Sequence, residues 1–217
     1  ITRAAKPKLA FVTAGDTDFN FVEMYRLDEF LARRGSPHKF VIFEGGHRWM
    51  PSPVAREAIE WFELLALNGD AESRAPELVN SLYAADLAEA RGLASAGRLI
   101  DAARRLREME RTYDGLLDVS TAKETADGIE AGDQYRRQRK ELTRAIGYED
   151  ACIARWSNEL VLFKNAEVPP PSRQLVGSLR LEDLMKRTNN PGADGLAAQK
   201  VLAAAIESLE TETVVYV

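Results

Sequence analysis

The first 67 residues alternate between short apolar runs and longer segments with helical spacing. Residues 8–14 (KLAFVTA) and 40–43 (FVIF) are almost continuously apolar, as strands buried on both faces are. Residues 21–34 and 51–65 instead carry apolar residues three and four positions apart, which is typical of amphipathic helices. The order strand, helix, strand, helix predicts a βαβ crossover with two adjacent parallel strands.

A sheet of two parallel strands needs further elements to cover its faces and edges. We expect Val12, Val41 and Ile42 to be buried inside such a sheet. The other strands must then come from a segment outside this sequence or from a partner chain.

Residues 68–217 have a different composition, richer in Ala, Arg, Glu and Leu, and their pattern is helical. Asn68-Gly69-Asp70 marks the boundary. Residues 76–96 and 98–113, separated by Gly97, predict a helical hairpin. Further helices are predicted in the ranges 118–146, 148–163 after a bend at Gly147, 181–187 and 195–209, before a β-prone tail at 214–217.

The predicted fold class is therefore α/β in residues 1–67 and all-α, built on a helical hairpin, in residues 68–217. The net charge of −5 and the pI near 5.3 argue against nucleic acid as a partner. No apolar run approaches the ~18–20 residues of a membrane span, so we expect no membrane-spanning segment in this sequence. No motif indicates a metal or a cofactor. The sequence begins with Ile1 and shows no signal peptide, so we expect the true N-terminus upstream and leave cytoplasm or export open.

Two residues with acid–base chemistry follow the two predicted strands. Asp18 comes shortly after the first strand and Gly15, and His47 follows the second strand and the Gly45-Gly46 pair. Reactive groups in open α/β sheets gather beyond the carboxyl ends of the strands, so we expect the two side chains within hydrogen-bond reach. A carboxylate beside a histidine fixes the tautomer of the imidazole and stabilises the imidazolium formed during proton transfer.

Plainer interpretations of these residues stay open. Asp16 and Asp18 can cap the helix that starts near Phe21, and Asp16 is the better candidate for such a structural role. His47 can be a surface-loop residue, and His38, which follows a Ser-Pro pair, is interpreted as a turn residue. The position of Asp18 and His47 at two strand ends favours the catalytic interpretation of that pair.

A nucleophile for this pair is missing from the sequence. No Gly-x-Ser-x-Gly segment occurs in the 217 residues, and none of Ser36, Ser52 and Ser95 lies on a predicted strand-to-helix turn. Cys152, the only cysteine, lies on a predicted helical face, where a cysteine usually acts as a small apolar residue.

The segments Gly15-Asp16-Thr17-Asp18, Phe43-Glu44-Gly45-Gly46-His47-Arg48-Trp49 and Ile59-Glu60-Trp61-Phe62 resemble the C-terminal end of an α/β-hydrolase. They are most similar to dienelactone hydrolases and prolyl-oligopeptidase-like esterases and peptidases. The resemblance covers about 60 of the 217 residues. It implies that Asp18 is the acid and His47 the histidine of a catalytic triad, with the serine and the oxyanion hole upstream of Ile1.

A second, weaker resemblance lies in the helical part. Small and large residues in the range 90–109 are similar to one tetratricopeptide repeat, although no second unit follows. A plain antiparallel helical hairpin is at least as good an interpretation.

Two functional hypotheses follow. In the first, the chain is a fragment of a serine hydrolase that carries the acid Asp18 and the base His47, and its partner is the remaining N-terminal hydrolase segment, in the same gene product or a separate chain. The isolated chain is then expected to be inactive. In the second, it is a non-catalytic helical interaction module, attached to a truncated hydrolase end, that binds a protein partner or self-associates.

Overall fold

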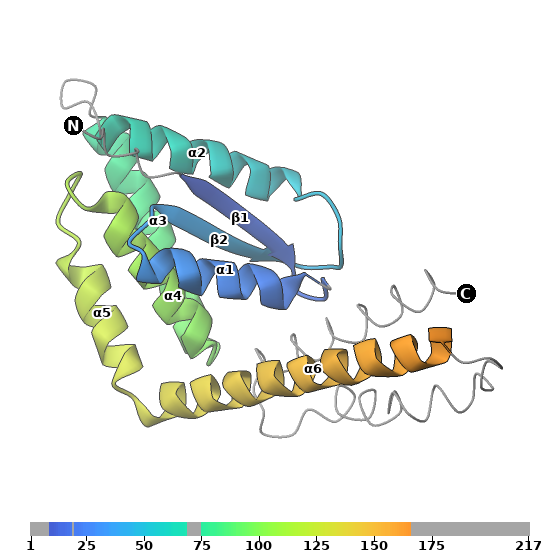
Figure 1. Ribbon diagram of the computed structural model, residues 1–217. Coiled ribbons are helices and arrows are strands. Elements are labelled where there is room, and N and C mark those ends of the chain that lie inside the picture. The colour runs from blue at the N-terminus through green and yellow to red at the C-terminus, as the bar shows by residue number, and fades with distance from the viewer. Residues whose placement is uncertain (1–8, 19, 69–74, 166–217) are drawn as a thin grey trace, which may run out of the picture.

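A computed structural model of the protein describes residues 9–18, 20–68 and 75–165 (Figure 1). This part is mostly helical and contains one small parallel sheet of two strands. The elements, in chain order, are β1 (Ala10–Gly15), α1 (Phe21–Arg33), β2 (His38–Phe43), α2 (Ser52–Asn68), α3 (Pro76–Ser95), α4 (Leu99–Tyr113), α5 (Ser120–Glu130) and α6 (Asp133–Asn165).

The two strands are adjacent and parallel, as the sequence pattern predicts. They pair in register from Ala10 opposite His38 to Gly15 opposite Phe43. Val12 is buried as expected. Val41 and Ile42 are only partly buried, which corrects the prediction for both. The reason is that they line a cavity of about 100 Å³ between β2 and helices α3 and α4.

The sheet lies between α1 and α2 (Figure 1). Successive residues of β1 point to opposite faces: the Phe11 ring contacts the Trp61 ring of α2, with centroids 6.0 Å apart, whereas Val12 packs in the cluster that contains Tyr25 of α1. This alternation is the two-residue period of a strand. Both faces of β1 are therefore used, in agreement with its continuous apolar run.

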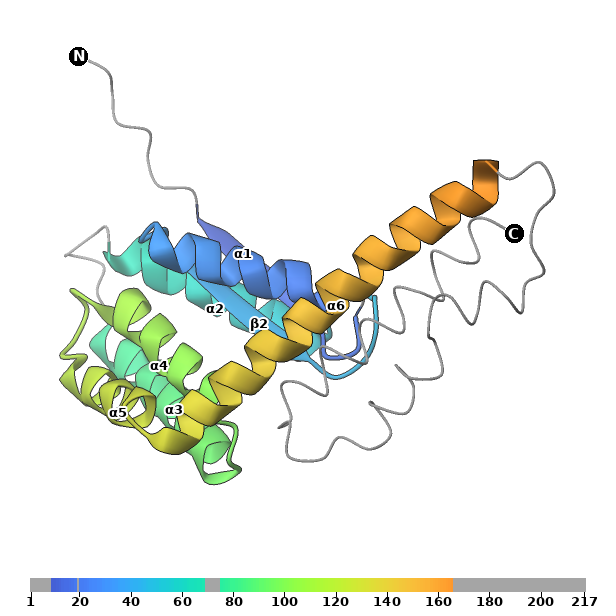
Figure 2. The ribbon, with the colours of Figure 1, turned by 60° about the horizontal axis from the view of Figure 1, so that its bottom comes forward.

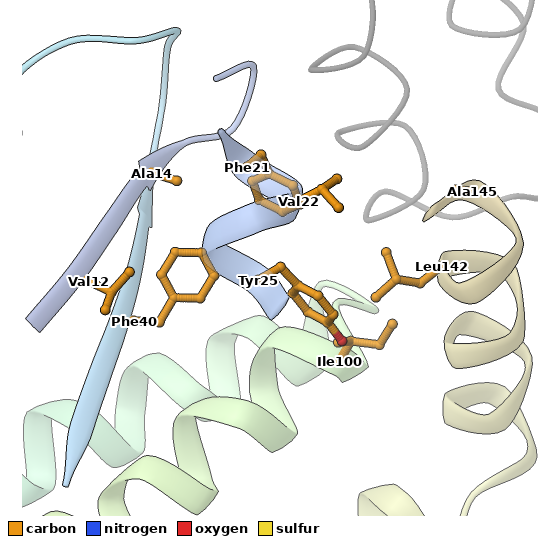
Figure 3. Packing of buried hydrophobic residues seen from close by; sticks show 9 residues of the cluster. All are labelled: Val12, Ala14, Phe21, Val22, Tyr25, Phe40, Ile100, Leu142 and Ala145. Carbon is orange, nitrogen blue, oxygen red and sulfur yellow. The ribbon is translucent and has the colours of Figure 1, made fainter. Parts of the chain in front are cut away.

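One hydrophobic cluster joins the sheet to the helical part of the chain (Figure 3). It contains Val12 and Phe40 from the strands together with Ile100 of α4 and Leu142 of α6. A second cluster consists of residues from α2 to α5. The division into domains 1–67 and 68–217 stays a prediction, but residues on both sides of it share the first cluster.

A buried network of charges also crosses this boundary. The Lys39 Nζ of β2 lies 2.9 Å from Glu57 Oε1 of α2 and 3.7 Å from Glu108 Oε2 of α4. The Arg105 guanidinium of α4 binds both of these glutamates and also Asp86 of α3. Although burial raises the pKa of Glu108, the positive charges of Lys39 and Arg105 outweigh it and lower that pKa. The network therefore ties β2, α2, α3 and α4 to one another.

The C-terminal helices differ in part from their prediction. The predicted helical hairpin is present as α3 and α4. The predicted bend at Gly147 is wrong, because α6 runs through it as one helix of 33 residues, and the break lies instead between α5 and α6. Figure 2 shows α6 extending beyond the sheet and its covering helices. The elements predicted at 181–187, 195–209 and 214–217 lie outside the described residues.

Candidate functional site

Asp18 lies in the turn between β1 and α1. Its backbone N–H donates to the carbonyl of Gly15, and its carbonyl accepts from the N–H of Phe21 in the first turn of α1. The side chain is only 7% exposed, and its Oδ1 accepts the N–H of Asn20 at 2.8 Å. These bonds hold the carboxylate at the carboxyl end of β1.

His47 lies in the loop between β2 and α2, at the same end of the sheet. Its Nδ1 is 3.2 Å from Asp18 Oδ1 and 3.3 Å from Oδ2, so the predicted contact between the two side chains is confirmed. The His47 side chain is 58% exposed. The pair thus combines a buried carboxylate with an imidazole that solvent or another molecule can reach.

This geometry determines which ring nitrogen carries the proton. An ionised carboxylate only accepts hydrogen bonds, so the Nδ1 of a neutral His47 carries the hydrogen and donates it to Asp18. Nε2 then has the lone pair, and it is the nitrogen that can take a proton from a hydroxyl group. The arrangement can therefore act as a general base supported by an acid.

His38 forms a second acid–histidine pair, and its interpretation as a turn residue is wrong. It is the first residue of β2 and is 1% exposed. Its Nδ1 lies 2.7 Å from the carbonyl oxygen of Ser36, and its Nε2 lies 3.1 Å from Asp28 Oδ1 on α1. Because both ring nitrogens face acceptor oxygens and the ring is buried, this pair is built for structure rather than for catalysis.

The helix-capping interpretation holds for Asp18 only in part. Asp18 bonds the amide of Asn20 as well as His47, so it both orders the start of α1 and contacts the imidazole. The Asp16 Oδ1, by contrast, accepts the N–H of Gly45 in the His47 loop at 2.9 Å. Sequence reasoning missed this bond, because a contact from a side chain to a distant backbone amide leaves no periodic signal.

The other candidate residues lie elsewhere. Ser36 precedes β2, Ser52 begins α2 and Ser95 ends α3, so none follows a strand directly. Cys152 is buried on α6. Within the described ranges no group of three or more His, Cys, Asp or Glu is placed to hold a metal ion. In the same ranges no helix is both long and apolar enough to cross a membrane.

The chain matches no protein-family model, no curated protein and no solved structure. An interpretation of its function therefore depends on the geometry around Asp18 and His47.

Proposed function

We propose that residues 1–67 are the carboxyl end of an α/β-hydrolase domain, in which Asp18 and His47 are the acid and the base of a catalytic triad. The observation that carries the proposal is the contact between the two side chains. They come from the loops after two adjacent parallel strands, and the imidazole is exposed whereas the carboxylate is buried. This is the relation that acid and base have in a serine hydrolase.

The reaction would be the cleavage of an ester or amide bond. A serine Oγ attacks the carbonyl carbon while His47 Nε2 takes the hydroxyl proton, and the imidazolium then gives this proton to the leaving group. Asp18 accepts the Nδ1–H throughout and stabilises the positive charge on the ring. Water repeats the two steps on the acyl-enzyme and regenerates the serine.

The nucleophile belongs, in this proposal, to a segment outside the 217 residues. In an α/β-hydrolase the serine precedes the acid along the chain, on a sharp turn between a strand and a helix. Among the described residues β1 has a single strand neighbour, β2. We therefore expect the strands that carry the nucleophile to add at the second edge of β1.

An esterase assay with p-nitrophenyl acetate tests the proposal on two proteins, the 217-residue chain and the same chain extended by its natural upstream residues. The chain alone should show no turnover that depends on His47. The extended protein should hydrolyse the ester, and His47→Ala should lower kcat by at least about 10³-fold, as the loss of a triad member does. Asp28→Asn, in the structural pair with His38, is the matched control and should keep kcat in every preparation that folds.

Two results would contradict the proposal. Turnover by the 217-residue chain that is lost in His47→Ala would refute the argument that the nucleophile lies outside it. An extended protein that contains a Gly-x-Ser-x-Gly turn, folds and stays inactive would favour the second hypothesis, a helical interaction module joined to a degenerate hydrolase end.

A further inference from the structure

The loop that carries His47 is fastened to the loop that carries Asp18 by bonds that meet at Gly45. The Gly45 N–H donates to Asp16 Oδ1 at 2.9 Å, and the Gly45 carbonyl accepts the N–H of Thr17 at 3.1 Å. One step earlier, the N–H of Asp16 donates to the carbonyl of Phe43 at 2.8 Å. Both backbone groups of Gly45 are therefore bound to the turn that leads to Asp18.

The two loops touch backbone to backbone at this point. A Cβ atom built on Gly15 would lie 2.0 Å from the carbonyl oxygen of Gly45 and 2.6 Å from that of Gly46, a separation that no real side chain allows. Gly45 itself has a φ of 121°, which L side chains rarely adopt. The two glycines thus permit the loops to approach closely, and the hydrogen bond from Gly45 to the Asp16 side chain holds them together.

We propose that Asp16 is a positioning residue, which places the His47 imidazole against Asp18 by binding the N–H of Gly45. This proposal rests on the proposed function, since it concerns the same acid and base. Asp16 is not itself a catalytic residue, because it acts on His47 through the backbone of the loop. The two aspartates of the segment 15–18 thus have different roles: Asp18 contacts the imidazole directly, and Asp16 binds the loop that carries it.

The side chain of Asp16 matters because a small displacement of the His47 loop would break the hydrogen bond between His47 and Asp18. His47 Nδ1 is 3.2 Å from the nearer Asp18 oxygen, at the long end of the range for an N–H···O hydrogen bond. Only Gly46 separates Gly45 from His47, so a shift of the Gly45 backbone is passed on to the imidazole. A displacement of about 1 Å would break the bond, and misplacements of this size can cost on the order of 10²-fold in rate.

NMR spectroscopy of the 15N-labelled chain tests the proposal without a nucleophile. The protein contains two histidines, so the ring nitrogens of His38 serve as an internal reference for those of His47. Asp16→Ala should shift the His47 nitrogens away from the Nδ1–H tautomer, whereas Asp16→Asn, which keeps an acceptor oxygen, should restore the wild-type pattern. Glu44→Ala, which removes an exposed carboxylate from the same loop, should leave the pattern unchanged.

The N-terminally extended protein gives a second readout. Asp16→Ala should lower kcat about 10- to 100-fold with little change in KM, since a misplaced base affects the chemical step rather than binding. Wild-type His47 nitrogens in Asp16→Ala would overturn the proposal, and so would an Asp16→Asn protein as impaired as Asp16→Ala. If Asp16→Ala fails to fold, hydrogen exchange of the unmodified protein decides: a protected Gly45 amide supports the bond, and one that exchanges as fast as the Glu44 amide refutes it.

These outcomes are independent of whether the protein is a hydrolase. An inactive extended protein in which the His47 tautomer still depends on Asp16 would refute the proposed function and retain the positioning role. An active protein in which Asp16→Ala changes neither readout would do the reverse.

Discussion

Replacement of Glu149 by glutamine should stabilise the protein at neutral and higher pH. Glu149 lies on α6, where it is 1% exposed, and its Oε2 has no hydrogen-bond partner among the residues that the structure describes. Burial is the main cause that raises the pKa of Glu149 to about 8, and the negative charge of Glu23 on the facing helix α1 adds to it. Arg26 acts in the opposite direction, and the neighbouring Asp150 raises the pKa further.

The sign of the effect follows from the direction of this shift. A carboxyl whose pKa is raised by folding binds its proton more tightly in the folded state, so stability falls as pH rises from the ordinary value of 4.5 to about 8. At pH 7 the unfolded chain has lost this proton and the folded protein keeps it. At ~1.4 kcal/mol per pH unit between pH 4.5 and pH 7, Glu149 lowers the free energy of unfolding by at most about 3 kcal/mol. Glutamine removes the ionisation but brings an amide that needs a partner, so we expect a gain of about 1–3 kcal/mol.

Urea unfolding of the wild type and Glu149→Gln measures this gain. Near pH 4.5 the free energies of unfolding of the two proteins should differ only by the cost of the buried amide. Toward pH 8 Glu149→Gln should gain stability relative to the wild type, with an unchanged dependence on urea concentration. Asp150→Asn is the matched control, because it removes the neighbouring carboxylate and the exposed ion pair with Arg26, for which we expect less than about 1 kcal/mol. A Glu149→Gln protein equal to or less stable than the wild type near pH 8 would refute the argument that the buried carboxylate costs stability.

Two further substitutions test the packing around the sheet. Gly15→Ala should destabilise the protein by a few kcal/mol and separate His47 from Asp18, because its Cβ would overlap the Gly45 carbonyl oxygen. The control is Gly92→Ala in α3, where an added Cβ meets no described residue within 4 Å, and it should stabilise the protein by about 0.5–1 kcal/mol. A Gly15→Ala protein as stable as the wild type would contradict the close approach of the two loops. Lys39→Met should lower the free energy of unfolding by about 3–5 kcal/mol, because it removes one of the buried positive charges that pair with Glu108. Thermal or urea unfolding measures this loss, and a value below about 1 kcal/mol would show that the ion pair does not stabilise the fold.

The local pattern of the sequence is enough to predict the βαβα segment. Residues 10–15 and 40–43 are short and apolar, and the helices on either side of β2 have a clear period, so each element is favoured by its own residues. The first two residues of β2, His38 and Lys39, are polar and lie outside the apolar run that predicts this strand. The bend expected at Gly147 does not occur, because an isolated glycine weakens a helix by only about 1 kcal/mol. The break falls instead at residues 131–132, before the helix that begins at Asp133.

The candidate site was predictable only where topology alone brings the residues together. Asp18 and His47 meet because the carboxyl ends of parallel strands lie at one edge of a sheet. Their contact thus follows from the strand order. The Asp16–Gly45 bond and the burial of His38 and Glu149 depend instead on contacts with other elements, which no periodicity in the sequence records.

The same long-range contacts connect the helical part to the site. Leu142 and Ala145 of α6 pack in one cluster with Phe21 and Val22, the first residues of α1, and Phe21 donates its N–H to the carbonyl of Asp18 (Figure 3). The helix that follows the catalytic acid in our proposal is thus held from one side by the sheet and from the other by α6. Since packing of an amphipathic face supplies most of the stability of a helix, α6 contributes to the position of Asp18 without touching it. On this argument α6 is a structural support of the Asp18–His47 pair.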